Sequence, residues 1–290
     1  MSDLIPKELM QYWISMAPGA FHVSFLSNKI DNQQVYTEMF EKFVDEGVLD
    51  RHGDKRGWYI PRQVILERLD YKTVDDSPVD IWLPFGLSDK VELYENSVVI
   101  VSGAPNAGKT AILLNILRFN QQKEWELHYF NSEMSGGELK KRLMKFYPEV
   151  ALDYWTFNAY NRAERFADVI FPGKNSINII DFLEVHDEFY IIGRRIKEIH
   201  DRLAGGIAII AIQKNPGNDT GLGGFRTMEV ARLALAIDYG TVKVTKAKNW
   251  RDSKYNPNNK RKDFKIVDGC KIIETSKWYT VQKNGSHEKE

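Results

Sequence analysis

A glycine-bounded loop directly after a β-branched run is the feature that most restricts how this chain can fold. Residues 98–101 read Val-Val-Ile-Val, residues 111–117 are mostly apolar, and between them lies the loop Gly103-Ala104-Pro105-Asn106-Ala107-Gly108-Lys109-Thr110. This is the pattern G-x-x-x-x-G-K-[ST] in the strand–loop–helix context that it requires. The sequence therefore predicts an α/β domain in which a buried strand leads into a phosphate-binding loop and a helix.

The residue types of this loop match the chemistry of a nucleoside triphosphate. Gly103 and Gly108 allow the backbone to curl so that its N–H groups face phosphate oxygens, and the helix that begins near Lys109 adds the positive end of its dipole. Lys109 is expected to neutralise the β- and γ-phosphates, and Thr110 to offer its hydroxyl to Mg²⁺. We therefore predict residues 103–110 as the nucleotide-binding loop and ATP with Mg²⁺ as its ligand. No base-reading motif distinguishes ATP from GTP.

The composition fits a globular protein without disulfides. Lys+Arg and Asp+Glu are both 40 among 290 residues, so the net charge does not favour a nucleic-acid partner. The single cysteine, Cys270, excludes a disulfide framework and suits a reducing compartment. No apolar run approaches the ~20 residues that span a bilayer, and residues 1–4 do not resemble a signal peptide. We expect a cytoplasmic protein without a membrane partner.

Residues 1–62 form a separate module in the sequence pattern. Helices are expected at 6–14, at 23–29 and between 31 and 47, followed by two strands, 48–52 and 57–60, joined by a turn. Three helices and a hairpin resemble a winged-helix module, whose wing residues Arg51, Lys55 and Arg56 and helix residues 32–34 would bind DNA. The alternative is docking to a protein partner, because the third helix is acidic along much of its length and would repel phosphates.

The chain changes character after this module. Residues 63–95 are expected to be a linker, residues 96–283 the α/β core that contains the phosphate-binding loop, and residues 284–290 a disordered tail. In the core, strands are expected at 126–131, 154–157, 177–181, 207–212, 234–237 and 241–246, a helix at 187–203, and a hairpin on an Asp-Gly turn at 268–269. Because continuous apolar strands alternate with helices, we predict a mostly parallel sheet covered on both faces.

Polar residues stand at the ends of three expected strands, at the edge where parallel sheets bind ligands. Glu133 follows the first strand, and its carboxylate would polarise the water that attacks the γ-phosphate. Asp181 ends the second strand and would hold Mg²⁺, while Glu184 is the rival for the catalytic carboxylate. Gln213 ends the third strand and would sense the γ-phosphate by hydrogen bonding. Lys214 then opens a loop, residues 215–224, that is rich in glycine and asparagine.

The order of these motifs resembles the RecA superfamily and, within it, the motor domain of DnaB-like hexameric replicative helicases. The resemblance covers residues 96–252 and rests on the P-loop, Ser132-Glu133-Met134-Ser135, the Ile-Ile-Asp-Phe-Leu run at 179–183 and the strand that ends in Gln213. It implies that Glu133 rather than Glu184 is the catalytic carboxylate and that Gln213 is the sensor. It also implies that Lys214 and Arg226 bound a loop facing single-stranded or double-stranded DNA at the centre of a ring.

A basic stretch at residues 245–251 is similar to a late strand of that family, whose Lys and Arg reach the γ-phosphate held by the neighbouring subunit. The pair is either Lys246 and Lys248 or Lys248 and Arg251, and we take Lys248 and Arg251 as the candidate catalytic residues. The resemblance therefore implies a homo-oligomer, such as a hexamer, with ATP at the subunit interfaces.

The expected fold and function follow from these motifs together. The predicted fold is α/β, a RecA-like core with a mostly parallel sheet plus a small winged-helix-like domain. The predicted function is an ATP-hydrolysing oligomeric motor that acts on DNA, helicase-like, in replication or recombination. One alternative is an ATP-switched DNA-binding regulator or loader that does not unwind, recombinase-like or transposition-associated, which the winged-helix-like module and short chain favour. The other is a RecA-fold ATPase that acts on protein.

Overall fold

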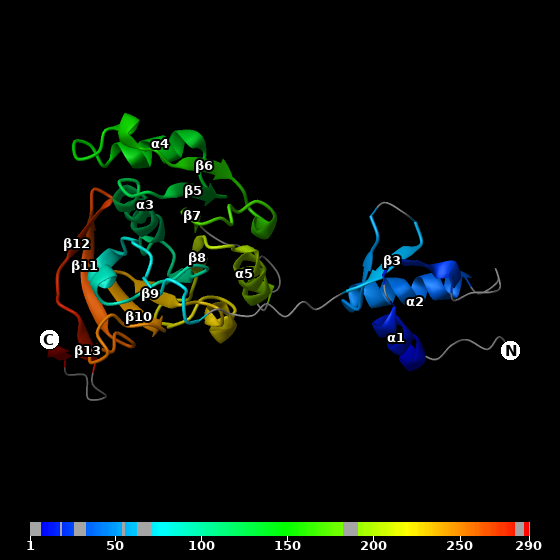
Figure 1. Ribbon diagram of the computed structural model, residues 1–290. Helices are drawn as coiled ribbons and strands as arrows, with labels where there is room; N and C mark the ends of the chain where they lie inside the picture. The colour runs from blue at the N-terminus through cyan, green and yellow to red at the C-terminus, as the bar shows by residue number, and fades with distance from the viewer. Residues whose placement is uncertain are drawn as a thin grey trace. The chain divides into compact units, whose positions relative to one another are not determined.

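Two compact units make up the chain. The computed structural model describes residues 7–17, 19–25, 33–53, 56–62, 71–181, 191–281 and 287–289. The chain divides into Met1–Asp75 and Asp76–Glu290. The two units are shown in Figure 1 and are described separately below.

The N-terminal unit combines helices with a small antiparallel sheet. Its elements are α1 (Lys7–Met16), β1 (Phe21–His22), the 3-10 turn η1 (Val23–Phe25), α2 (Gln33–Asp45), β2 (Leu49–Arg51) and β3 (Trp58–Pro61). The strands pair in the order β1-β3-β2, so β2 and β3 form the expected hairpin and β1 adds to it. The helix expected at 23–29 begins as η1, and its remainder lies outside the described residues.

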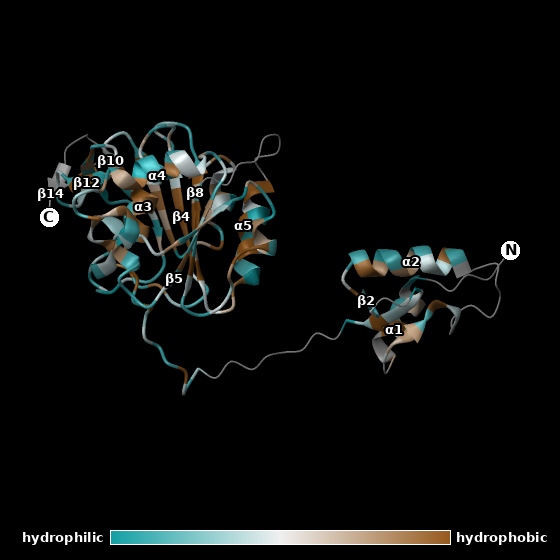
Figure 2. Cartoon of the chain, turned by 90° about the horizontal axis from the view of Figure 1, so that it is seen from above, coloured by the Kyte–Doolittle hydropathy of each residue, from teal (hydrophilic) through white to brown (hydrophobic). Residues whose placement is uncertain are grey.

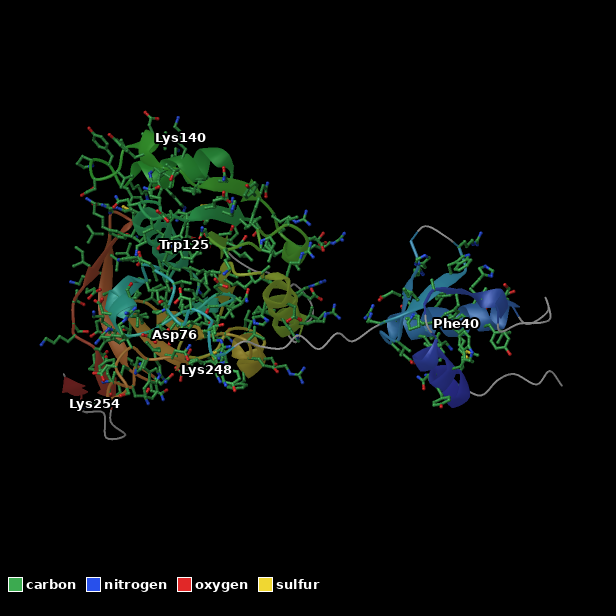
Figure 3. All side chains as sticks on the ribbon, viewed as in Figure 1. Phe40, Asp76, Trp125, Lys140, Lys248 and Lys254 are labelled. Carbon is green, nitrogen blue, oxygen red and sulfur yellow. The ribbon has the colours of Figure 1, made fainter. Side chains whose placement is uncertain are left out.

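An aromatic core holds this unit together. Met10 and Ile14 of α1, and Phe40 and Phe43 of α2, are each at most 1% exposed. The Phe40 ring packs against Tyr59 of β3 with ring centroids 5.2 Å apart; Phe40 is labelled in Figure 3. The spacing of these apolar residues gives each helix one buried face, which joins both helices to the sheet.

The second unit is built on an 11-stranded sheet. Its strand order is β14-β13-β11-β10-β9-β4-β8-β7-β5-β6, with β12 paired to β11 alone. From β9 to β6 all neighbouring strands are parallel, whereas the strands from β10 onward are antiparallel. The bounds are β4 (Val98–Gly103), β5 (Glu126–Asn131), β6 (Asn158–Asn161), β7 (Ser176–Asp181), β8 (Ile207–Gln213), β9 (Leu233–Asp238), β10 (Thr241–Ala247), β11 (Arg261–Val267), β12 (Lys271–Glu274), β13 (Tyr279–Val281) and β14 (His287–Lys289).

Helices cover both faces of this sheet, as the continuous apolar strands predicted. The helices are α3 (Lys109–Asn120), α4 (Gly136–Met144) and α5 (Ile191–Arg202), with short 3-10 turns η3 (Pro84–Asp89), η4 (Leu152–Tyr154), η5 (Phe166–Asp168) and η6 (Gly224–Met228). Figures 1 and 2 place α3 and α5 on opposite sides of β4 and β8. The sheet has a hydrophobic core on each face, and alternate residues of a strand point into opposite cores. Val99 packs in the core on the α3 side, and Ile100 packs in the core on the α5 side.

Residues 76–95 belong to the second unit, which corrects the expected linker boundary at residue 95. Ile81, Leu83, Phe85 and Leu87 are at most 6% exposed and pack in the core on the α3 side. The side chain of Asn120 accepts a hydrogen bond from Trp82 N and donates one to Trp82 O. Pro84 and Gly86 interrupt regular structure in this segment, but its apolar residues still anchor it to the sheet.

Two further expectations are corrected. The strand expected at 154–157 lies instead at β6, Asn158–Asn161. It occupies the sheet edge, where polar residues are solvated, while Trp155 and Phe157 pack against the core from irregular chain. The tail expected to be disordered contains β14, which pairs with β13. Within the described part of the chain, no helix is long and apolar enough to cross a bilayer.

Candidate nucleotide-binding site

The phosphate-binding loop begins at the end of the central strand β4 and needs its two glycines for different reasons. Gly108 has φ 96°, the left-handed region that favours glycine, and it precedes α3 directly. A Cβ built at Gly103 would lie 2.4 Å from Cγ of Lys109, so the lysine stem passes where any other side chain would be. The loop therefore curls back over β4 and brings Lys109 to its inner side.

The side chain of Lys109 is hydrogen-bonded to the backbone of the phosphate-binding loop. Its Nζ donates to the carbonyl oxygens of Gly103 at 3.0 Å and Ala104 at 3.1 Å. Burial lowers the pKa of Lys109, and the nearby carboxylates of Asp181 and Glu133 partly offset that effect. The ammonium group therefore lies between the loop and two carboxylates, where a phosphate would neutralise it.

Asp181 ends β7 in a buried position. Its side chain accepts a hydrogen bond from the Tyr129 hydroxyl at 2.5 Å and another from Thr110. Burial raises the pKa of Asp181, and these two hydrogen bonds oppose the rise. The Thr110 hydroxyl and the Asp181 carboxylate are thus adjacent oxygen donors, the ligand type that Mg²⁺ prefers, so the residues fit the predicted metal.

Glu133 is positioned by a turn that Asn131 organises. Asn131 Oδ1 accepts from the backbone N–H of Glu133 at 3.1 Å and of Met134 at 2.7 Å, and its Nδ2 donates to Met134 O. Asn131 is level with Asp181 in the parallel pair β5–β7. Glu133 is therefore exposed, and it follows β5 at the same edge of the sheet at which β7 ends with Asp181.

A single cavity brings the predicted nucleotide residues together. Its volume is about 410 Å³, within the usual range for small-molecule sites. It is lined by Pro105, Asn106, Gly108, Lys109, Thr110, Ala111, Glu133, Arg142, Asp181, Gln213, Ile266 and Gly269. Gln213 reaches it because it is level with Gly103 in the parallel pair β4–β8. Glu184, the rival carboxylate, lies outside the described residues.

Four residues of this cavity were not predicted, and one of them, Ala111, directly follows the predicted loop. Arg142 comes from α4, and Ile266 and Gly269 come from the hairpin β11–β12, about which the P-loop motif carries no information. Asn115 of α3 fixes the hairpin by donating to Cys270 O at 2.7 Å. Short-range patterns predicted both the helix and the hairpin, but no local signal indicates that the two meet.

Lys214 is not available to DNA, contrary to the expectation from the resemblance. Its side chain is fully buried, and its Nζ forms an ion pair with Asp238 at 2.5 Å. Asp238 ends β9 and also accepts from the backbone N–H of Gly217. Lys214 therefore neutralises Asp238, and Asp238 in turn binds the backbone of the loop at residues 215–224. Arg226, by contrast, is exposed on η6.

Lys248 and Arg251 lie away from this cavity. Ala247 is level with Leu233, which is level with Val99 near the start of β4, whereas the phosphate-binding loop follows the end of that strand. Both cations therefore lie at the opposite edge of the sheet. Lys246 is bound internally, because its Nζ donates to the carbonyls of Met228 and Glu229.

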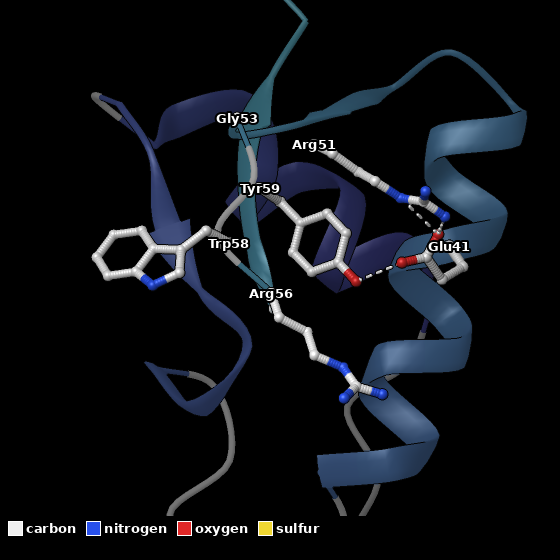
Figure 4. A pocket seen from close by; sticks show the side chains of 7 residues that line it. Glu41, Arg51, Gly53, Arg56, Trp58 and Tyr59 are labelled. Atoms are coloured by element: carbon white, nitrogen blue, oxygen red, sulfur yellow. Dashed lines mark hydrogen bonds and ion pairs between the residues drawn. The ribbon is translucent and has the colours of Figure 1, made fainter.

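The basic wing of the N-terminal unit is partly neutralised. Arg51 forms an ion pair with Glu41 of α2 at 2.5 Å, and Tyr59 donates to the same carboxylate at 2.8 Å (Figure 4). The hydrogen bond from Arg51 lowers the pKa of Glu41. Arg56 is exposed and lines a small surface pocket together with Glu41, Arg51 and Tyr59, whereas Lys55 lies outside the described residues.

The sheet order, the helices on both faces and the P-loop after β4 define the second unit as a RecA-like P-loop fold of the α/β class, as predicted. Among solved structures, a KaiC-like protein from the hyperthermophilic archaeon Pyrococcus horikoshii OT3 is similar to this chain. The two match with a TM-score of 0.50 and 15% identity, over 69% of this chain and 99% of that chain. No family model matches the chain, and no curated protein matches it by sequence.

Proposed function

We propose that the chain is an ATPase that hydrolyses ATP in the cavity between the phosphate-binding loop, Glu133, Asp181 and Gln213. The observation that carries this proposal is that these groups, from the ends of the four strands β4, β5, β7 and β8, line one cavity. A loop that only bound a phosphate would not need a carboxylate at Glu133 or an amide at Gln213 facing it.

The residues suggest a division of roles. The backbone N–H groups of residues 103–110 and the N-terminus of α3 bind the phosphates, and Lys109 neutralises their charge. Thr110 and Asp181 would hold Mg²⁺, which when bound neutralises charge on the β- and γ-phosphate oxygens. Glu133 accepts a proton from the attacking water, and Gln213 donates a hydrogen bond near the γ-phosphate.

Phosphate release tests the ATPase proposal. We expect the purified chain to hydrolyse ATP, Lys109→Ala to lose nucleotide binding, and Gln213→Ala to bind ATP but turn it over more slowly. ATP binding without turnover, under conditions that saturate the site, would leave a nucleotide switch and refute hydrolysis.

We also propose that the active form is a homo-oligomer in which Lys248 and Arg251 complete the site of a second copy. Their place at the edge opposite the cavity supports this, since they cannot reach the nucleotide of their own chain. Mixing Lys109→Ala with Arg251→Ala tests it: each is inactive alone, and a mixed oligomer contains interfaces in which both faces are intact. No recovery of turnover on mixing would contradict the shared site.

DNA is the partner we propose for this motor, through Arg226 and, in the winged-helix-like unit, Arg56 and Lys55. Single-stranded DNA should stimulate turnover, and Arg226→Ala should reduce that stimulation; absence of both binding and stimulation refutes a DNA motor. The burial of Lys214 and the pairing of Arg51 with Glu41 favour the alternative, an ATPase directed at protein, because they remove two of the expected phosphate contacts. Binding of DNA without strand displacement would select the non-unwinding regulator.

A further inference from the structure

Arg142 places a second cation in the nucleotide cavity, from the same chain as the phosphate-binding loop. It lines the cavity together with Lys109, Glu133 and Asp181. Burial raises the pKa of both the Asp181 carboxyl and the Tyr129 hydroxyl, and the nearby charge of Arg142 partly opposes that rise. Two carboxylates and two cations therefore face one another where the phosphates are expected.

The position of Arg142 is fixed by the start of α4. Ser135 caps this helix: its hydroxyl accepts from Glu138 N at 3.3 Å, and the Glu138 carboxylate accepts from Ser135 N at 2.8 Å. Arg142 lies seven residues after Ser135, so it shares a helix face with Ser135 and Glu138. Leu139 and Leu143 are buried on the inner side and attach α4 to the core. The turn that positions Glu133 leads directly into the capped start of α4, so it also helps to position Arg142.

Packing does not account for this arginine. Arg142 is exposed, and no ion pair or side-chain hydrogen bond joins it to another residue in the part of the chain that the structure describes. Its planar guanidinium is suited to two parallel hydrogen bonds with phosphate oxygens. Charge develops on the γ-phosphoryl oxygens during transfer, and an arginine that reaches them is among the strongest contributors to this reaction.

We infer that Arg142 is a catalytic residue that contacts the terminal phosphate of the nucleotide in its own chain. The inference rests on the proposed ATPase function. It differs from the proposed role of Lys248 and Arg251, because a cation supplied by the same chain acts without a second copy. The loss of Arg142 should therefore reduce turnover by the same factor at every protein concentration at which the parent protein hydrolyses ATP, whereas the loss of Arg251 should matter only where oligomers form.

The test compares Arg142→Ala and Arg142→Lys with Lys141→Ala. Lys141 is the matched control, because it is the neighbouring exposed cation on the same helix and does not line the cavity. We expect Arg142→Ala to lower kcat about 100-fold or more, Arg142→Lys to recover part of that loss, and Lys141→Ala to stay within about twofold of the parent. Binding of ADP should be unchanged in all three variants, because ADP lacks the terminal phosphate.

Two results would overturn the inference. One is an Arg142→Ala variant with the turnover of the parent protein. The other is a loss of ADP affinity as large as the loss of turnover, which would mean that Arg142 only maintains the pocket. If the parent protein binds ATP but does not hydrolyse it, the ATPase proposal fails while this contact is still tested: Arg142→Ala must then lose the preference for ATP over ADP that the parent shows.

Discussion

The contact between Gly108 and the C-terminal hairpin can be tested by Gly108→Ala. Gly108 has φ 96°, and a Cβ built there would lie 2.0 Å from Cδ1 of Ile266 and 3.5 Å from its Cγ1. Two costs add. A left-handed conformation costs an L residue about 1–2 kcal/mol, and overpacking against Ile266 costs about 1–3 kcal/mol. We expect the free energy of unfolding to fall by about 2–5 kcal/mol.

Ile266→Val separates these two costs, because valine lacks Cδ1 and so removes the clash without changing the backbone. Alone, Ile266→Val should cost about 0.5–1.5 kcal/mol. In the double variant the clash is gone, so only the loss from Ile266→Val and the backbone strain at residue 108 remain. The double variant should therefore lose about 1–3 kcal/mol less stability than the sum of the two single variants. Urea unfolding of the four proteins measures the difference. Additivity within about 0.5 kcal/mol would refute the close contact between the hairpin and the loop.

Three further predictions concern single residues. Glu133→Gln should retain ATP binding and lower kcat about 100-fold or more in a phosphate-release assay; unchanged turnover would exclude it as the general base. Burial lowers the pKa of His128, so the unfolded chain binds its proton more readily, and stability should fall by up to about 1.4 kcal/mol per unit as pH drops below about 6.5. His128→Phe, which preserves stacking on Phe171, should flatten that dependence in denaturation midpoints; an unchanged slope would contradict it. Lys214→Met should cost about 3 kcal/mol or less, since Asp238 is partly exposed, whereas Arg226→Ala should cost less than about 0.5 kcal/mol; equal losses in thermal unfolding would argue against the buried ion pair.

Local patterns predicted much of the second unit. The strands β5 and β7 end where the apolar runs end, so Glu133 and Asp181 could be placed at one edge of the sheet before the structure was known. Gln213 followed from the same argument for β8. Each placement needed only a continuous apolar run and the rule that parallel sheets bind ligands at the carboxyl ends of their strands, whereas the choice of Glu133 over Glu184 came from the family resemblance.

The rest depends on contacts between residues far apart in the sequence. Lys214 follows a buried strand and opens a glycine-rich loop, a pattern typical of an exposed cation. It is nevertheless paired with Asp238, because β8 and β9 flank β4 and both end at the same edge of the sheet. Arg142 carries no motif, and only the cap at Ser135 and the burial of Leu139 direct it to the cavity. The edge strand β6 was misplaced because aromatic residues before it resemble a strand more than its own polar residues do.

The anchoring of the hairpin to α3 also bears on how the nucleotide site is completed during synthesis. Asn115 and Cys270, which join the two elements, are 155 residues apart, and a chain emerges from the ribosome N-terminus first. The phosphate-binding loop is therefore made long before the segment that covers it. Until Cys270 has been synthesised, the pocket lacks the hairpin that lines it with Ile266 and Gly269, so the nucleotide that we propose could gain those contacts only afterwards.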